Sequence, residues 1–337
     1  MEYYCAAVTD RGFYDGFLEV FNEKSLKRLY VIKGASGVGK STLMRKIADE
    51  GTRRGMKVDR VFCSNDPRSL DGVIVGNIGV IDGTPPHTYE PKMAGAFEKL
   101  VDLGQFWDVN KLKAHRAELF ELSKRKQTAF SKIYELTSVY GRMDDLIDEE
   151  WRVCYLRGKI RDYVRSLVRR NLASGNKGEA KMRIFSATFG GNVELPHKKQ
   201  YSIDNTSGFA PLFFEELIAE LKRNNLECFC SPALPSMRRT DTVYLPSLGI
   251  VYTSHRGGRA INGSRFMTCA PSKKTQAELK QLESIKTSIK DAIFRERENA
   301  VACHDEIERI YIGAMDFDKL NEYTNGLIKE IFSSFEE

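Results

Sequence analysis

The sequence lacks long hydrophobic runs and a recognisable export signal. No apolar stretch approaches the roughly 20 residues that a membrane-spanning helix requires. The first residues, MEYYCAAVTDRG, contain no basic segment followed by an apolar one. We therefore expect a soluble cytoplasmic protein that has no membrane partner.

Regularly spaced metal ligands are also missing. Of the seven cysteines, only Cys228 and Cys230 lie close together, and no second pair completes a zinc site. The odd number and scattered spacing favour reduced thiols in a reducing compartment.

Neither sign of charge is in large excess. The 337 residues include 52 Lys and Arg against 46 Asp and Glu, so the net charge is +6. This mild excess leaves a nucleic-acid partner open without favouring one. Hydrophobic residues make up 42% of a chain in the size range of two domains, which is enough for genuine cores.

Residues 29–82 alternate in the manner of an α/β fold. The segments RLYVIKG and MKVDRVFC predict buried strands, and a third strand is expected near residues 78–81. Between the first two strands, GKSTLMRKIADEGTRRG has helical spacing and ends near Gly55. The pattern predicts parallel-sheet units covered by helices.

Long charged segments follow each α/β segment. We expect helical arms over about residues 97–172 and 271–337, and a break near Gly141 predicts that the first arm folds as a hairpin of two long helices. The polar segment NLASGNKGEAK suggests a boundary between units 1–176 and 177–337.

The two halves of the sequence resemble each other in order and spacing. The match predicts a duplicated unit whose copies pair within the chain. The matched residues are Tyr30 and Tyr201, Gly37 and Gly208, Cys63 and Cys230, Arg68 and Arg238, Asp71 and Asp241, Gly79 and Gly249, and His87 and His255.

The segment GASGVGKS fits the phosphate-binding pattern G-x-x-x-x-G-K-[ST] between a predicted strand and a predicted helix. Glycines let backbone N–H groups turn toward phosphate oxygens, Lys40 would reach the β and γ phosphates, and Ser41 would offer a ligand to Mg²⁺. The expected ATP-binding residues are Gly34, Ala35, Ser36, Gly37, Val38, Gly39, Lys40, Ser41 and Thr42.

A second acidic residue should complete the Mg²⁺ site at a strand end. Asp82 ends the apolar run NIGVID and has no acidic counterpart in the second half, so we expect it to be the catalytic and metal-binding acid. Asp66 is the second candidate, whereas Asp71 persists in the second half, which indicates a role in the structure or at an interface. For each acid, a turn or a helix cap is the alternative.

The second half contains DNTSGFAPLF where the first has its phosphate loop. Ala210, Pro211 and Leu212 then stand for Gly39, Lys40 and Ser41, so we expect this copy not to bind nucleotide. If the copies face each other, Arg238 or Arg239 could reach the nucleotide as an arginine finger. A surface arginine is the alternative for both.

The segments YVIKGASGVGKSTLMRKIA, FCSNDPRSLDGVI, IDGTPPHTYEP and LGQFWD resemble a family of uncharacterised bacterial tandem P-loop ATPases. The resemblance covers nearly the whole chain and implies two P-loop units, ATP binding and hydrolysis. Members commonly carry a glycine-lysine-serine or glycine-lysine-threonine loop in each unit, and this sequence departs from that pattern in its second half.

The sequence is compatible with three functions. The first is an ATPase whose hydrolysis moves the helical arms. The second is a small-molecule or nucleotide kinase that uses basic loops with Arg256, Arg259 and Arg265. The third is an ATP-dependent binding module without catalysis. No N/T-K-x-D guanine motif is present, so ATP is preferred to GTP.

Overall fold

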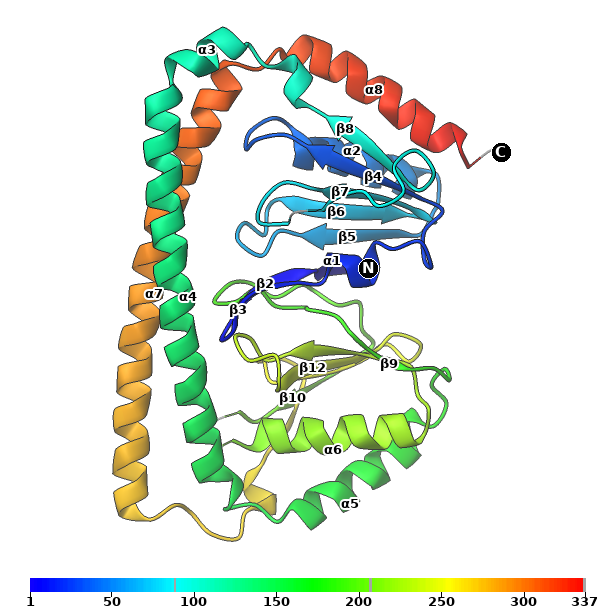
Figure 1. Ribbon diagram of the computed structural model, residues 1–337. Helices are drawn as coiled ribbons and strands as arrows, with labels where there is room; N and C mark the ends of the chain where they lie inside the picture. Colours follow the sequence, from blue (N-terminus) through cyan, green and yellow to red (C-terminus); the bar gives the residue numbers. More distant parts are fainter. Residues whose placement is uncertain (88, 206–207, 336–337) are drawn as a thin grey trace. The chain divides into compact units, whose positions relative to one another are not determined.

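The computed structural model describes residues 1–87, 89–205 and 208–335 and is a mixed α/β protein with long helices (Figure 1). It has two compact units, which do not coincide with the sequence halves 1–176 and 177–337. The first unit comprises Met1–Ala6, Asp15–Ile133 and Phe294–Glu337, and the second comprises Ala7–Tyr14 and Tyr134–Ile293.

The sheet of the first unit has the order β1-β5-β6-β7-β4-β8. Its strands are β1 (Glu2–Tyr4), β5 (Val58–Phe62), β6 (Leu70–Val75), β7 (Ile78–Asp82), β4 (Arg28–Lys33) and β8 (Glu98–Asp102). The three strands predicted in this region are confirmed. The predicted parallel sheet is confirmed in part: β1–β5, β7–β4 and β4–β8 pair in parallel, whereas β6 is antiparallel to both neighbours and joins β7 through a tight turn at Gly76.

Two helices that are distant in sequence build the core of the first unit. Helix α2 (Lys40–Arg53) buries Leu43, Met44 and Ile47 against the sheet. Helix α8 (Phe317–Ser333), near the end of the chain, adds Leu327 and Ile331 to the same core and contacts α2 (Figure 1). The last helix therefore completes the unit that begins with the first strand.

The second sheet repeats this order and these strand directions as β9-β11-β12-β13-β10-β14. Its strands are β9 (Ala180–Met182), β11 (Cys228–Pro232), β12 (Thr240–Leu245), β13 (Ile250–Thr253), β10 (Lys199–Ile203) and β14 (Arg259–Ile261). The sequence patterns of KQYSIDNTSG, LECFC and SLGIVYTSH predict strands, and the structure confirms a strand in each, namely β10, β11 and β13.

The second unit is likewise completed by a helix from the other half of the sequence. Helix α6 (Phe209–Arg223) packs beside α5 (Arg157–Leu167), which comes from the first half of the sequence. We call α8 and α5 the exchanged helices. The Glu216 carboxylate accepts hydrogen bonds from Arg157 at 2.6 Å and Arg161 at 3.1 Å. This exchange is why a boundary near residue 176 does not separate the two units.

Apart from two long helices described below, the remaining described elements are short. They are β2 (Ala6–Thr9), β3 (Gly12–Asp15), α1 (Phe17–Val20), α3 (Val109–Ala114), two 3-10 turns (Gly104–Phe106 and Ser264–Phe266) and one π-helical turn (Val168–Leu172).

The first predicted arm is not a hairpin of two long helices. Helix α4 (Arg116–Arg152) continues through Gly141 without a break. A Cβ atom at Gly141 would lie 2.5 Å from the Cβ of Asp10, so this glycine permits a close approach of chain rather than ending a helix.

Helix α4 pairs with α7 (Lys273–Gly313) in each unit (Figure 1). Within the first unit, Leu122 packs with Cys303 and Ile307. Within the second unit, Lys286 forms an ion pair with Asp144. The two helices each contribute residues to both units.

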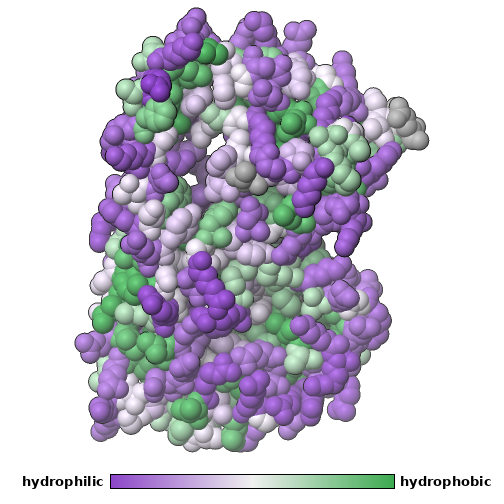
Figure 2. Space-filling model, in the orientation of Figure 1, coloured by the Kyte–Doolittle hydropathy of each residue, from purple (hydrophilic) through white to green (hydrophobic). Residues whose placement is uncertain are grey.

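The surface is largely charged. On the face drawn in Figure 2, hydrophilic residues predominate and hydrophobic residues lie between them in small groups. Across the described residues, no helix combines the length and the apolar character needed to cross a bilayer.

Candidate functional site

The loop Gly34–Gly39 joins β4 to α2 at the carboxyl end of the strand. Gly37 has φ +76° and Gly39 has φ +87°, a region that favours glycine. A Cβ atom at Gly37 would lie 2.7 Å from Cγ of Glu308 on α7. The glycines thus permit both the turn and its close contact with α7, while Val38 is buried in the core below.

The N–H groups of this loop remain available to a ligand. Within the described part of the chain, the backbone N–H groups of residues 36–40 donate to no protein acceptor. Helix α2 also has no side-chain cap at its N-terminus. Consecutive unbonded N–H groups beside a helix N-terminus form a site for an anion such as phosphate.

Lys40 lies at the end of this loop and is mostly buried. Its Nζ donates to the carbonyl oxygens of Gly34 at 2.8 Å and Ala35 at 2.6 Å. The same atom lies 3.6 Å from Oδ2 of Asp82. The structure thus brings together the loop, its lysine and the first-choice acid.

Asp82 ends β7, as predicted, and its carboxylate is held on both sides. Oδ1 accepts from the backbone N–H of Thr84 at 2.9 Å and from its hydroxyl at 2.5 Å, while Oδ2 faces Lys40. Burial raises the pKa of Asp82, and the positive charge of Lys40 only partly offsets this effect. A buried carboxylate of this kind gains from an additional cation.

Asp66 occupies a different environment. Its side chain is 46% exposed and accepts a hydrogen bond at 2.9 Å from Arg68, which is itself exposed. No contact joins Asp66 to Lys40 in the described residues, so the geometry favours Asp82 over Asp66.

Ser41 and Thr42 begin α2. The Ser41 hydroxyl oxygen accepts a hydrogen bond at 2.9 Å from the N–H of Leu70, whereas Thr42 is exposed. No group of three or more His, Cys, Asp or Glu side chains suited to a metal occurs among the described residues. Any Mg²⁺ held here would therefore have Ser41 and Asp82 as its protein ligands and would take its other ligands from phosphate and water.

A histidine–aspartate pair lies beside the site. Nε2 of His87 is 3.0 Å from Oδ2 of Asp71, and both side chains are buried. Burial by itself would lower the pKa of His87, but the hydrogen bond and charge of Asp71 outweigh it and raise this pKa. Asp71 therefore has a buried partner within its own unit.

The second unit repeats this pair. Nε2 of His255 lies 3.2 Å from Oδ2 of Asp241, and the hydrogen bond that His255 donates to Asp241 raises the pKa of His255. The sequence match noted each of these residues but not that they meet, because the histidine and the aspartate belong to different segments of each half.

The helix start defines which loop residues are equivalent in the two sheets. Gly39 and Gly208 both precede their helix with positive φ, +87° and +67°. The predicted equivalences are wrong by two positions, because the second loop is two residues shorter; its residues 206–207 lie outside the described residues. The equivalent pairs are Lys40 with Phe209 and Ser41 with Ala210.

Strand pairing likewise corrects the counterpart of Asp82. Val80 and Tyr252 occupy equivalent positions, since each pairs with the tyrosine of its neighbouring parallel strand. Two residues later, Ser254 rather than Tyr252 stands where Asp82 stands. The carboxylate is absent from the second unit in either alignment. The strand register also shows that two other predicted equivalences are wrong: Cys63 does not correspond to Cys230, and Gly79 does not correspond to Gly249.

Arg238 and Arg239 form ion pairs with carboxylates of their own unit. Arg238 pairs with Asp10 at 3.1 Å and with Asp145, and Arg239 forms a close pair with Asp148. These contacts give both guanidinium groups a structural role, and the arginine-finger prediction gains no support from them.

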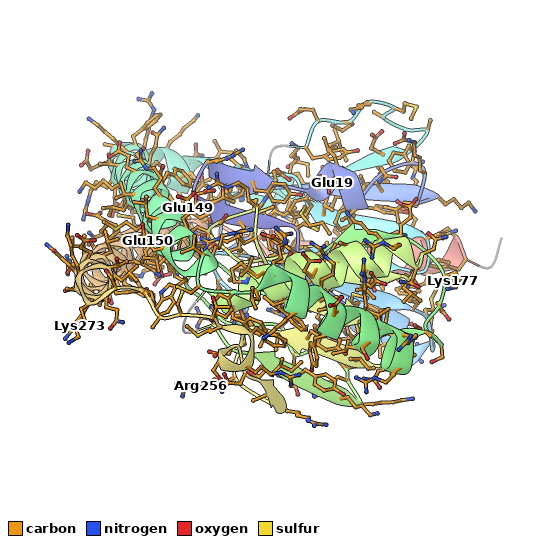
Figure 3. The ribbon with its side chains drawn as sticks, turned by 90° about the horizontal axis from the view of Figure 1, so that it is seen from below. Glu19, Glu149, Glu150, Lys177, Arg256 and Lys273 are labelled. Carbon is orange, nitrogen blue, oxygen red and sulfur yellow. The ribbon has the colours of Figure 1, made fainter. Side chains whose placement is uncertain are left out.

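The basic loop residues of the kinase alternative are exposed. Figure 3 labels Arg256 on the outer side of the second unit. The guanidinium of Arg265 lies 4.6 Å from the ring centroid of Tyr163. These observations give no support to a common ligand position for the three arginines.

Sequence reasoning missed two residues that approach the loop from the helical pair. His304 of α7 has Nδ1 3.4 Å from the Ser36 hydroxyl, and Lys126 of α4 has Nζ 3.0 Å from the same Nδ1. Both lie in charged helical sequence with no local motif, so only the packing of α4 and α7 reveals them.

The site thus consists of the β4–α2 loop, Lys40, Ser41 and Asp82, with the pair Asp71 and His87 beside it and α7 against it. Comparison with protein-family models, curated proteins and solved structures found no match to this chain.

Proposed function

We propose that the first unit binds Mg²⁺–ATP at the β4–α2 loop and hydrolyses it. The proposal depends on the consecutive backbone N–H groups of residues 36–40, which donate to no acceptor among the described residues. The side-chain ammonium group of Lys40 lies at the same loop. Such consecutive N–H groups offer several donors to phosphate oxygens, and Lys40 adds the charge that the β and γ phosphates require.

The residues present also fit Mg²⁺. Bound Mg²⁺ would neutralise negative charge on phosphate oxygens. Ser41 and Asp82 would hold the ion, because a hydroxyl and a carboxylate supply the oxygen ligands that Mg²⁺ prefers. Lys40 keeps Asp82 oriented toward the loop.

We further propose that the second unit is a copy of the first that has lost its nucleotide site. The repeated strand order and directions support a common origin. Phe209 and Ala210 supply neither the cation of Lys40 nor the hydroxyl of Ser41. Phe209 is buried in the core, so its position is filled by packing rather than left open.

Phosphate release from ATP and Mg²⁺, with no other acceptor added, tests the proposed hydrolysis. We expect release by the full chain that stops when Mg²⁺ is chelated and is absent in Lys40→Ala. Phosphate that appears only on an added small molecule would indicate the kinase alternative, and a Lys40→Ala variant with unchanged turnover would contradict the proposal.

A further inference from the structure

Lys126 is a half-buried cation that lacks an acidic partner. It lies on α4, and its only polar contact in the described part of the chain is the one between Nζ and Nδ1 of His304, at 3.0 Å. By contrast, Lys132 on the same helix pairs with Glu296 of α7 at 3.0 Å. A partly buried ammonium group without a carboxylate costs free energy unless an anion reaches it.

The contact with His304 does not neutralise this charge. A lysine ammonium can only donate, so Nδ1 of His304 must accept, and the ring is neutral. Burial and then the charge of Lys126 lower the pKa of His304, in agreement with a neutral ring. His304 thus orients Lys126 without supplying a negative charge; the nearest acid to the ring is Glu308, whose carboxylate lies 4.0 Å from Nε2, on the side of the ring away from the Nδ1 contact.

The same residues reach the phosphate loop. Nδ1 of His304 is 3.4 Å from the hydroxyl of Ser36, and the segment around Glu308 packs against Gly37. Lys126 is therefore linked to the Ser36 hydroxyl through a single atom of His304, while Lys40 lies at the end of the same loop. Burial lowers the pKa of Lys126, and the charge of Lys40 contributes in the same direction.

We propose that Lys126 is a second phosphate-binding lysine, which α4 carries to the terminal phosphate of the nucleotide bound at the β4–α2 loop. The inference rests on the proposed function and specifies which nucleotide the site distinguishes. An ATP-shaped ligand, with its extra phosphate, would satisfy Lys126, whereas ADP would leave it uncompensated. Helix α4 would in this way respond to the presence of the terminal phosphate.

Equilibrium binding of a non-hydrolysable ATP analogue and of ADP to the full chain tests this inference. Lys126→Met removes the charge and retains most of the side-chain length. We expect its affinity for the ATP analogue to fall about tenfold or more, with ADP affinity changed less than about twofold. Lys132→Met removes a lysine that already has a partner and should leave both affinities unchanged.

The outcomes separate this inference from the proposed function. If the unaltered chain binds neither nucleotide, the proposed function fails. If the unaltered chain binds both nucleotides, and Lys126→Met lowers both affinities equally or changes neither, the proposed role of Lys126 is overturned.

Amine labelling of the unaltered chain provides a readout that does not depend on folding of a variant. The ATP analogue should suppress modification of Lys126, as followed by mass spectrometry, whereas ADP should not, and Lys132 should label equally in both. Equal labelling of Lys126 with both nucleotides would overturn the inference.

Discussion

Lys40 and Asp82 lie opposite each other at the strand ends of the first unit, with Nζ 3.6 Å from Oδ2 and both side chains mostly buried. The lysine comes from the helix start after β4 and the aspartate from the end of β7, two strands that pair in parallel. Parallel pairing brings these two carboxyl ends to one edge of the sheet, and it is therefore the fold that joins the two charges.

Asp82→Asn should remove the dependence of nucleotide binding on Mg²⁺. The amide retains the shape of the side chain but not the charge that would attract the ion, so we expect about a tenfold or greater loss of affinity with Mg²⁺ and little change without it. Titration of a labelled ATP analogue with and without Mg²⁺ measures both. Asp66→Asn serves as the control, because that carboxylate is exposed and bound to Arg68; an equal effect of both substitutions would count against Asp82.

Gly37→Ala should damage the loop more than an equivalent change elsewhere. An alanine at this position would have to adopt a positive φ of +76°, which L residues disfavour, and its methyl group would lie 2.7 Å from Cγ of Glu308. Gly55 also has positive φ, +71°, but its Cβ position is open. We expect Gly55→Ala to lower the free energy of unfolding by about 1–2 kcal/mol without loss of nucleotide affinity, and Gly37→Ala to lower both. Equal nucleotide affinity in the two variants would contradict the described loop.

The His87–Asp71 pair should make stability depend on pH. Because the pKa of His87 is raised in the folded chain, the pair stabilises fully below the ordinary histidine pKa of about 6.5, and this contribution is lost as the pH rises through the folded value. We expect His87→Gln to cost about 1–3 kcal/mol near pH 6 and less near pH 9, as measured by denaturant unfolding.

His255→Gln is the matched control for this pair. The same atoms meet Asp241, but the His255 side chain is 39% exposed, so the expected loss is smaller. A loss for His87→Gln that does not vary with pH would show that the pair contributes through packing alone.

The exchanged helix α8 should be essential to the first unit. Ile331 is fully buried in its core, so Ile331→Ala should lower the free energy of unfolding by about 2–5 kcal/mol. Ile312 on α7 is 44% exposed, and Ile312→Ala should cost much less. Thermal unfolding of both variants would test the packing, and similar melting temperatures would argue against it.

Local sequence patterns predicted the elements that carry the candidate site. The apolar run before Gly34 forms β4, and the glycines and Lys40 form the turn and helix start that the motif requires. These features depend on neighbouring residues, so they are visible in sequence. The position of Asp82 at a strand end was predictable for the same reason.

The remaining features depend on long-range packing. Gly141 looks like a helix break in sequence, yet it lies within α4, where the missing side chain leaves room for Asp10. The turn at Gly76 determines the direction of β6, and α5 and α8 each complete a unit formed mainly from the other half of the sequence. Lys126 and His304 acquire their relation to the loop only through contacts between α4, α7 and that loop.

Equilibrium titration of the full chain with a labelled ATP analogue and Mg²⁺ measures whether the β4–α2 loop binds nucleotide. We expect one binding site per chain and a loss of affinity of about tenfold or more in Lys40→Ala, because the charge-assisted contacts of the ammonium group disappear. The absence of binding, two sites of similar affinity, or unchanged binding by Lys40→Ala would contradict the proposed nucleotide site.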